Sequence, residues 1–243
     1  MNVGVYVDGF NVYFGGRYLC GPAAAGWKWL DIRSLAADLV ARRRNWQEAR
    51  IHRVTYCTAL IDGAFNPDGR IRQDAYLRAL QQSSTVDHIE LGHYVSRVKT
   101  APLATKGKNG KPNVTKANWP VMVQDSLGSA VPGASFMVSV ATREEKGSDV
   151  NLASHLLVDI YEGAVDAAVV LSNDSDLRYP IEEARKKVPV GTVNPTKSQL
   201  AGDLRGTSND GVGRHWWYQL TCADLQAHQL PNTAGGVDKP TSW

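Results

Sequence analysis

Two stretches of the chain are apolar at almost every position. They cover residues 3–7 and residues 167–172, and each runs directly into a segment that contains aspartate. Continuous apolar runs of this length are typical of strands that are buried on both faces of a parallel sheet. The pattern therefore predicts two central strands with acidic side chains at or just beyond their carboxyl ends.

Apolar residues at helical spacing surround these runs. In residues 31–44, Ile32, Leu35 and Leu39 fall on one face, and Asp31 precedes them as a candidate N-cap. Further helices are predicted at residues 71–82, 149–161 and 177–187, strands at residues 50–58, 86–98 and 188–193, and a turn at residues 66–69. Because strands and helices alternate, we expect an α/β fold with a parallel sheet and helices on both faces.

One segment interrupts this alternation. Residues 99–118 contain five lysines among Gly, Asn, Pro and Thr, and short apolar runs follow at residues 121–123 and 136–140. This composition indicates a basic loop or a β-hairpin arm outside the core, inserted near residues 99–135.

The overall composition is that of an ordinary globular protein. The chain has 243 residues, 43% of them hydrophobic, and a formal net charge of +3, which by itself implies no polyanion partner. It has no apolar run long enough for a membrane span and no signal sequence, so we expect a cytoplasmic protein that does not enter a membrane. Cys20, Cys57 and Cys222 have neither zinc-site nor disulfide-framework spacing, so all three are expected to be reduced.

Acidic residues supply the candidate chemistry. Asp8 follows the first apolar run, and Asp174 and Asp176 follow the second. Because ligands of open α/β sheets bind beyond the carboxyl ends of the strands, these carboxylates should converge there, and Asp149 could join them. Crowded carboxylates repel one another unless a cation neutralises them, and oxygen ligands favour Mg²⁺ or Mn²⁺. Each Asp taken alone could equally be a helix N-cap.

Three motifs resemble those of a known family. Residues 7–11, 146–150 and 171–176 are similar, in order and spacing, to the motifs of NYN domains, which belong to the PIN-like nuclease superfamily and include the bacterial LabA-like proteins. The resemblance covers roughly residues 3–195. Residues 196–243 would then be a C-terminal extension that packs on the domain and ends in a frayed tail.

The resemblance implies a fold, an activity and a set of site residues. The fold would be a PIN-like, Rossmann-like three-layer α/β/α sandwich, and the activity that of a metal-dependent ribonuclease. Asp8, Asp149, Asp174 and Asp176 would be the catalytic residues and the ligands of Mg²⁺ or Mn²⁺. The residues expected to contact RNA are Asn11, Arg143, Lys146, Ser172 and Asn194. The family commonly has a further Asp where this chain has His155. Asp159, one helical turn later, could take the place of that Asp.

Two functional alternatives stay open from the sequence. The first is a ribonuclease that hydrolyses RNA phosphodiester bonds at the acidic edge. The second is a catalytically silent PIN-like module that binds RNA or a protein partner, because a fold does not prove an activity. The aromatic residues at 216–218 suit a segment docked on the sheet or a homodimer contact better than a stacking platform for bases.

Overall fold

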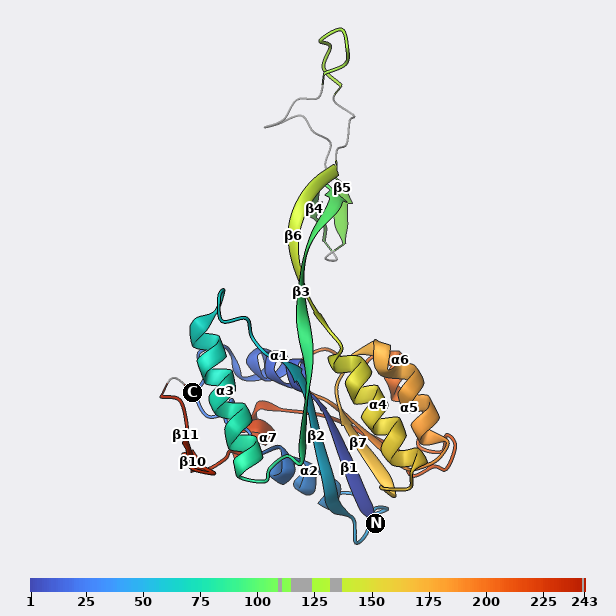
Figure 1. Ribbon diagram of the computed structural model, residues 1–243. Coiled ribbons are helices and arrows are strands. Elements are labelled where there is room, and N and C mark those ends of the chain that lie inside the picture. The colour runs from blue at the N-terminus through green and yellow to red at the C-terminus, as the bar shows by residue number, and fades with distance from the viewer. Residues whose placement is uncertain (109–110, 115–123, 132–136, 242) are drawn as a thin grey trace. The chain divides into compact units, whose positions relative to one another are not determined.

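The structure, a computed structural model, describes residues 1–108, 111–114, 124–131, 137–241 and 243 (Figure 1). The chain divides into two compact units. The larger unit comprises Met1–His93 and Glu145–Trp243, and the smaller one comprises Tyr94–Glu144. All the acidic residues expected at the site belong to the larger unit.

Strands and helices alternate through the larger unit. The strands of the chain are β1 (Asn2–Asp8), β2 (Arg50–Ala59), β3 (His88–Pro102), β4 (Ala104–Lys106), β5 (Pro112–Val114), β6 (Met137–Lys146), β7 (Ala167–Leu171), β8 (Val190–Asn194), β9 (Trp216–Gln219), β10 (Thr233–Ala234) and β11 (Val237–Asp238). The helices are α1 (Gly9–Cys20), α2 (Ile32–Ala41), α3 (Pro67–Gln82), α4 (Ser148–Tyr161), the 3-10 turn η1 (Ser175–Leu177), α5 (Arg178–Arg185), α6 (Gly202–Arg205) and α7 (Cys222–Ala227).

The main sheet has seven strands in the order β6-β3-β2-β1-β7-β8-β9. Each described pairing from β3 across to β9 is parallel. The strand order runs outward from β1 in both directions, and β1 lies between β2 and β7 (Figure 1). The predicted α/β fold with a mostly parallel sheet is therefore confirmed. A crevice for ligands is expected where the order reverses, beyond the carboxyl ends of β1 and β7.

Side chains of β1 enter two different hydrophobic cores. Val5 and Val7 belong to the cluster that includes the buried face of α2, whereas Tyr6 belongs to a second cluster with Leu152 of α4. All four side chains are fully buried. Because side chains alternate along a strand, Asp8, two positions after Tyr6, lies on the α4 side of the sheet.

Polar caps begin the helices of the larger unit. Asp31 accepts a hydrogen bond from the Ser34 amide at 2.9 Å, which confirms its predicted N-cap role. Asn66 accepts one from the Gly69 amide at 2.9 Å, so residues 66–69 are the first turn of α3 rather than a separate turn. Proline fits at the first helical position because no amide hydrogen is needed there.

The smaller unit contains the described part of the lysine-rich segment. β4 and β5 pair antiparallel as a hairpin, and Lys99 forms an ion pair with Glu144. The apolar run predicted at residues 121–123 lies outside the described residues.

The C-terminal segment adds an edge strand to the main sheet. β9 pairs in parallel with β8, as expected for a segment that docks on the sheet. The ring of Trp216 contacts that of Trp46 with 5.4 Å between centroids, and the Arg43 guanidinium lies 4.3 Å from the centroid of the Trp216 ring. The aromatic residue at 216 therefore stabilises the fold.

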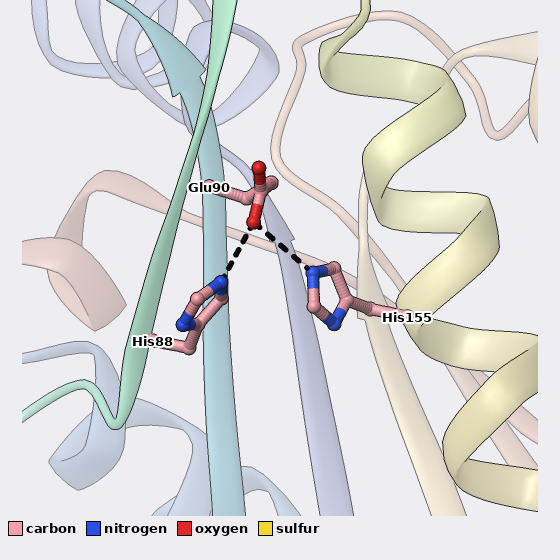
Figure 2. A group of neighbouring side chains, drawn as sticks. All are labelled: His88, Glu90 and His155. Atoms are coloured by element: carbon pink, nitrogen blue, oxygen red, sulfur yellow. Dashed lines mark hydrogen bonds and ion pairs between the residues drawn. The ribbon is translucent and has the colours of Figure 1, made fainter.

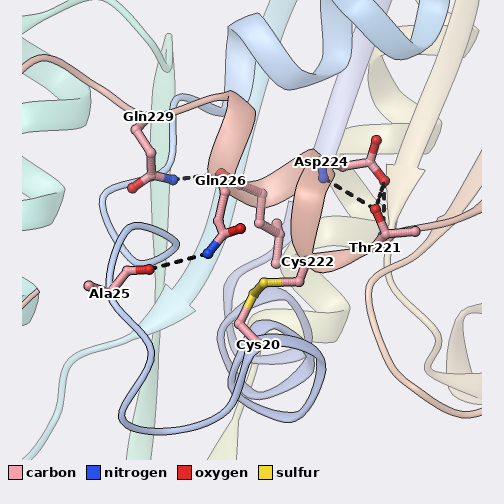
Figure 3. Close-up of a disulfide and its surroundings, with 8 residues drawn as sticks. Cys20, Ala25, Thr221, Cys222, Asp224, Gln226 and Gln229 are labelled. Atoms are coloured by element: carbon pink, nitrogen blue, oxygen red, sulfur yellow. Dashed lines mark hydrogen bonds between the residues drawn. A yellow bond between two sulfur atoms is a disulfide. The ribbon is translucent and has the colours of Figure 1, made fainter.

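A disulfide joins Cys20 at the end of α1 to Cys222 at the start of α7 (Figure 3). The expectation that all three cysteines are reduced was therefore wrong for this pair, while Cys57 is free and buried. The two bonded residues are 202 positions apart, so only the folded topology brings them together. Within the described residues, none of the helices is both long and apolar enough to cross a membrane. A cytoplasmic location stays a prediction.

Loss of this disulfide should destabilise the protein. Cys222→Ser is expected to lower the free energy of unfolding by about 2–4 kcal/mol, because the bond restricts the unfolded chain. Denaturant unfolding with and without dithiothreitol measures this change. The reductant should act on the parent protein and leave Cys222→Ser unchanged. Equal stability of the parent in both buffers would show that the bond contributes nothing.

Candidate functional site

Asp8 ends β1 and is held at the carboxyl edge of the sheet by two hydrogen bonds. Its Oδ1 accepts from the Asn11 amide and its Oδ2 from the Ser172 hydroxyl, each at 2.9 Å. The side chain is only 4% exposed, and burial raises the pKa of its carboxyl despite these bonds. Asp8 therefore caps α1 and also presents a buried carboxylate at the reversal point of the sheet.

Asp174 and Asp176 follow β7 on the neighbouring strand. Asp174 accepts a hydrogen bond from the Asp176 amide at 2.9 Å and caps η1, and its own amide donates to the Ser172 hydroxyl at 3.1 Å. Asp176 is exposed. Ser172 is fully buried and connects the segment after β7 to Asp8 through its hydroxyl. Its role is to position these residues.

Asp149 lies in the first turn of α4 but does not cap it. Gly147 precedes the helix with φ of 101°, a left-handed conformation that favours glycine. The Glu145 carboxylate takes the capping role, because it accepts from the Ser148 amide at 3.1 Å and from the Ser148 hydroxyl at 2.8 Å. Asp149 is therefore not the N-cap of α4, and its carboxylate is available for another interaction.

Asp8, Asp149, Asp174 and Asp176, here called the acidic cluster, interact through their charges. Burial raises the pKa of Asp149 to about 6, and the carboxylates of Asp8, Asp174, Glu145 and Asp176 add to this shift in that order. Such repulsion favours a bound cation. The ligand atoms of the acidic cluster do not form one compact group, however. Within the described residues, one group of three His, Cys, Asp or Glu side chains has its ligand atoms within 4.8 Å of one another, and it consists of other residues.

The residues expected to contact substrate have different roles. Asn11 accepts a hydrogen bond from the Asn173 amide at 3.0 Å, which ties the first motif to the third. Asn194 is fully buried, and its Nδ2 donates to the Ser198 carbonyl at 2.8 Å and to Gln219 at 2.9 Å, which are contacts within the fold. Lys146 is exposed, and the side chain of Arg143 lies outside the described residues.

The compact group of ligand-type side chains is His88, Glu90 and His155, here called the histidine cluster (Figure 2). The Nε2 atoms of His88 and His155 lie 2.7 and 3.3 Å from the same Glu90 Oε2. Hydrogen bonds with both imidazoles lower the pKa of Glu90. The sequence had singled out His155, as a departure from the NYN pattern, but neither of its partners.

Asp159 does not replace the family Asp at the acidic cluster. Its carboxylate is 2% exposed, accepts from the Tyr6 hydroxyl at 2.9 Å and pairs with Arg53 at 2.8 Å. A buried carboxylate with these partners holds α4 to β1 and β2.

A pocket of about 560 Å³ opens beside the acidic cluster. This edge pocket is lined by Phe10, Asn11, Phe14, Gly15, Tyr18, Asn173, Thr196, Lys197 and Ser198. The rings of Phe10 and Phe14 are nearly parallel, with centroids 6.4 Å apart. Asn11 joins the pocket to Asp8 through its amide, and Asn173 precedes Asp174 in the chain.

Comparison with known proteins gives one named relative. The chain is 28% identical over 262 aligned residues to 6-hydroxy-3-succinoylpyridine 3-monooxygenase HspA of Pseudomonas putida, covering 98% of this chain and 74% of that protein. A crystal structure of a protein of unknown function from Vibrio parahaemolyticus is similar with a TM-score of 0.45 at 16% identity, covering 94% of this chain and 96% of that chain. No protein-family model matches the chain.

The named relative contradicts the ribonuclease prediction. A monooxygenase catalyses an oxidation, whereas a ribonuclease hydrolyses phosphodiester bonds, and the match extends over almost the whole chain. The physical reason for the error is that carboxylates at a sheet edge indicate an oxygen-ligated cation without specifying the reaction. The NYN resemblance and the RNA partner stay predictions from the motifs.

Neutralising Asp149 should stabilise the protein when divalent cations are absent. Its pKa is raised from 3.8 to about 6, so the contribution of Asp149 to stability falls as pH rises from about 4 to about 6. In EDTA at pH 7, Asp149→Asn should therefore be more stable by about 1 kcal/mol after allowance for solvent screening, and the gain should vanish below about pH 4.

Thermal unfolding between pH 4 and pH 8 measures this difference. Asp203→Asn is a matched control, because Asp203 is an exposed residue of α6. An Asp149→Asn variant that is no more stable than the parent at pH 7 would contradict the repulsion described for the acidic cluster.

Proposed function

We propose that the chain is an oxidoreductase that hydroxylates a small aromatic acid in the edge pocket, with a divalent cation held by the acidic cluster. The observation that carries this proposal is an aromatic pocket at the reversal point of the sheet, whose lining residue Asn11 is hydrogen-bonded to Asp8 and whose lining residue Asn173 precedes Asp174. The reaction class follows that of the named relative.

The lining of the edge pocket suits a planar ring that carries a negative charge. Phe10, Phe14 and Tyr18 offer ring faces, and aromatic rings prefer offset or edge-on contact with one another. Lys197 is exposed and can pair with a substrate carboxylate. The relative is named for a substrate of this kind, a hydroxypyridine with a succinoyl group.

The acidic cluster offers oxygen ligands of the kind that a hard divalent cation prefers. Asp8, Asp149 and Asp174 would hold Mg²⁺ or Mn²⁺ through carboxylate oxygens. Burial raises the pKa of Asp149, and the neighbouring carboxylates add to this shift. When bound, the ion would neutralise these carboxylates and attract an oxygen atom of the substrate. Asn11 and Ser172 keep Asp8 in place for this role.

The proposed reaction balances with dioxygen and a two-electron reductant. At a ring carbon that carries an acyl group, as position 3 of the relative's named substrate does, one oxygen atom is inserted into the bond between the ring carbon and the acyl carbon. The resulting ester hydrolyses to a hydroxylated ring and a free carboxylic acid. The other oxygen atom is reduced to water by two electrons, supplied by a reduced nicotinamide nucleotide, together with two protons. The chain itself binds and orients the ring.

We also propose that the fold is a PIN-like three-layer α/β/α sandwich. Separate hydrophobic clusters join β1 to α2 and to α4, which supports helices on both faces of the sheet. Such a fold would be compatible with an oxidoreductase, because one fold hosts many activities.

Oxygen uptake by the purified protein tests the proposed activity. With 6-hydroxy-3-succinoylpyridine, NADH and Mn²⁺ or Mg²⁺, we expect uptake coupled to a hydroxylated product. Asp174→Asn keeps the capping geometry but removes the charge, and it should lower kcat/KM at least about tenfold.

Lys197→Ala should raise KM about tenfold, because a charge-assisted hydrogen bond contributes about 1.5 kcal/mol.

Asp203→Asn serves as the control and should retain the parent activity. Absence of uptake and product with either metal and a panel of aromatic acids would refute the oxidation. Retention of single-stranded RNA by the same inactive protein would instead favour the binding module predicted from the motifs.

A further inference from the structure

We propose that His88, Glu90 and His155 form a binding site for a first-row transition metal ion, separate from the acidic cluster. Two imidazoles and one carboxylate are a ligand set that binds Fe²⁺, Co²⁺, Ni²⁺ or Zn²⁺ and leaves other coordination positions open. Metal binding at this site does not depend on the proposed oxidation. Any role of the ion in a reaction with dioxygen does rest on that proposed function.

Local structure brings the three side chains together. His88 and Glu90 are two residues apart on β3, so they project from the same face of the strand. His155 reaches them from α4, which packs on that side of the sheet, as Figure 2 shows. A strand and a helix thus hold the ligands from two directions.

The distances match those between neighbouring ligands of one ion. Ligands about 2.1 Å from a metal and about 90° apart lie about 3.0 Å from each other. The His88 and His155 Nε2 atoms are 2.7 and 3.3 Å from Glu90 Oε2, and all three ligand atoms are within 4.8 Å of one another. An ion therefore needs only small side-chain adjustments, with no change in the backbone.

The site is open to an external ligand. The side chains of His88, Glu90 and His155 are 42%, 35% and 25% exposed. A structural zinc site usually surrounds its ion with four protein ligands, whereas three ligands at a partly exposed position leave room for water or a small molecule. This geometry favours an exchangeable ion over a purely structural one.

The two sites share one row of the sheet but differ in chemistry. Asp8 pairs with Cys57 and Cys57 pairs with Glu90 in the strand register, so Asp8 and Glu90 are two strand spacings, or about 10 Å, apart. Burial, with the nearby Glu90, Asp8 and Asp149, raises the pKa of Cys57 to about 12. Cys57 is buried and lies between the two sites in this row of the sheet.

This difference in ligands predicts that the sites select different ions. The histidine cluster has imidazole nitrogens, which suit Co²⁺ and Zn²⁺ far better than Mg²⁺. The acidic cluster offers oxygen atoms alone, which suit Mg²⁺ and Mn²⁺. Excess Mg²⁺ should therefore leave an ion at the histidine cluster in place.

Titration of the full-length, untagged protein with Co²⁺ tests the site. In the presence of excess Mg²⁺, one Co²⁺ should bind with visible absorption bands that indicate nitrogen ligation, and with shifts of the His88 and His155 imidazole NMR signals. His88→Ala, Glu90→Gln and His155→Ala should each weaken Co²⁺ binding at least about tenfold. Zn²⁺ should displace the Co²⁺ from the parent protein.

His93→Ala is the matched control, because His93 is an exposed histidine on the same strand. It should bind Co²⁺ like the parent, and circular dichroism should show that every variant is folded. Equal affinity in the parent and the three ligand variants, or an equal loss in His93→Ala, would overturn the site.

Asp174→Asn separates this proposal from the proposed function. Co²⁺ binding should be unchanged in Asp174→Asn. Co²⁺ bound through the histidine cluster by a protein without oxidation activity would support the metal site and refute only the activity. Activity without Co²⁺ binding at the cluster would overturn the metal site alone.

Discussion

Repulsion between carboxylates at one edge of a parallel sheet is the constraint on which the rest of the site depends. β1 and β7 are neighbours with the same direction, so Asp8 and Asp174 emerge at the same edge. Hydrogen bonds from Asn11 and Ser172 keep the Asp8 carboxylate there in spite of its burial. The fold thus keeps these carboxylates near enough that their charges add to the raised pKa values of Asp8 and Asp149.

The sequence was most informative where local chemistry decides structure. Continuous apolar residues predicted the buried central strands β1 and β7, and Asp31 predicted the start of α2. Asn66 was misread as part of a turn, because an Asn-Pro signal is common to turns and to capped helix starts. In such cases the packing of the following residues decides between the two.

Long-range neighbours could not be predicted from the sequence. The Cys20–Cys222 bond joins residues 202 positions apart, and His155 meets Glu90 only because α4 packs on β1 and β2, next to which β3 lies. The pair His88 and Glu90 did carry a local signal, since alternate residues of a strand share a face. Two residues alone do not indicate a metal site, and the third ligand, His155 on α4, became apparent only in the folded structure.

The motifs predict an oxygen-ligated ion, which stays a prediction, and they do not specify the reaction. Asp8, Asp149 and Asp174 suggest oxygen ligation in any enzyme class, and the aromatic edge pocket beside them bears on the substrate instead. The 28% identity to a monooxygenase contradicts the predicted hydrolysis and supports the proposal of an oxidation. A pocket, a charge pattern and a relative therefore constrain different parts of the function.

Anomalous diffraction from crystals soaked separately in Mn²⁺ and in Co²⁺ tests this account most directly. We predict a Mn²⁺ peak among the carboxylates of Asp8, Asp149 and Asp174, next to the edge pocket, and a separate Co²⁺ peak between the histidine-cluster side chains. Absence of Mn²⁺ from the acidic cluster in fully soaked crystals would contradict the claim that the sheet edge is built around a cation.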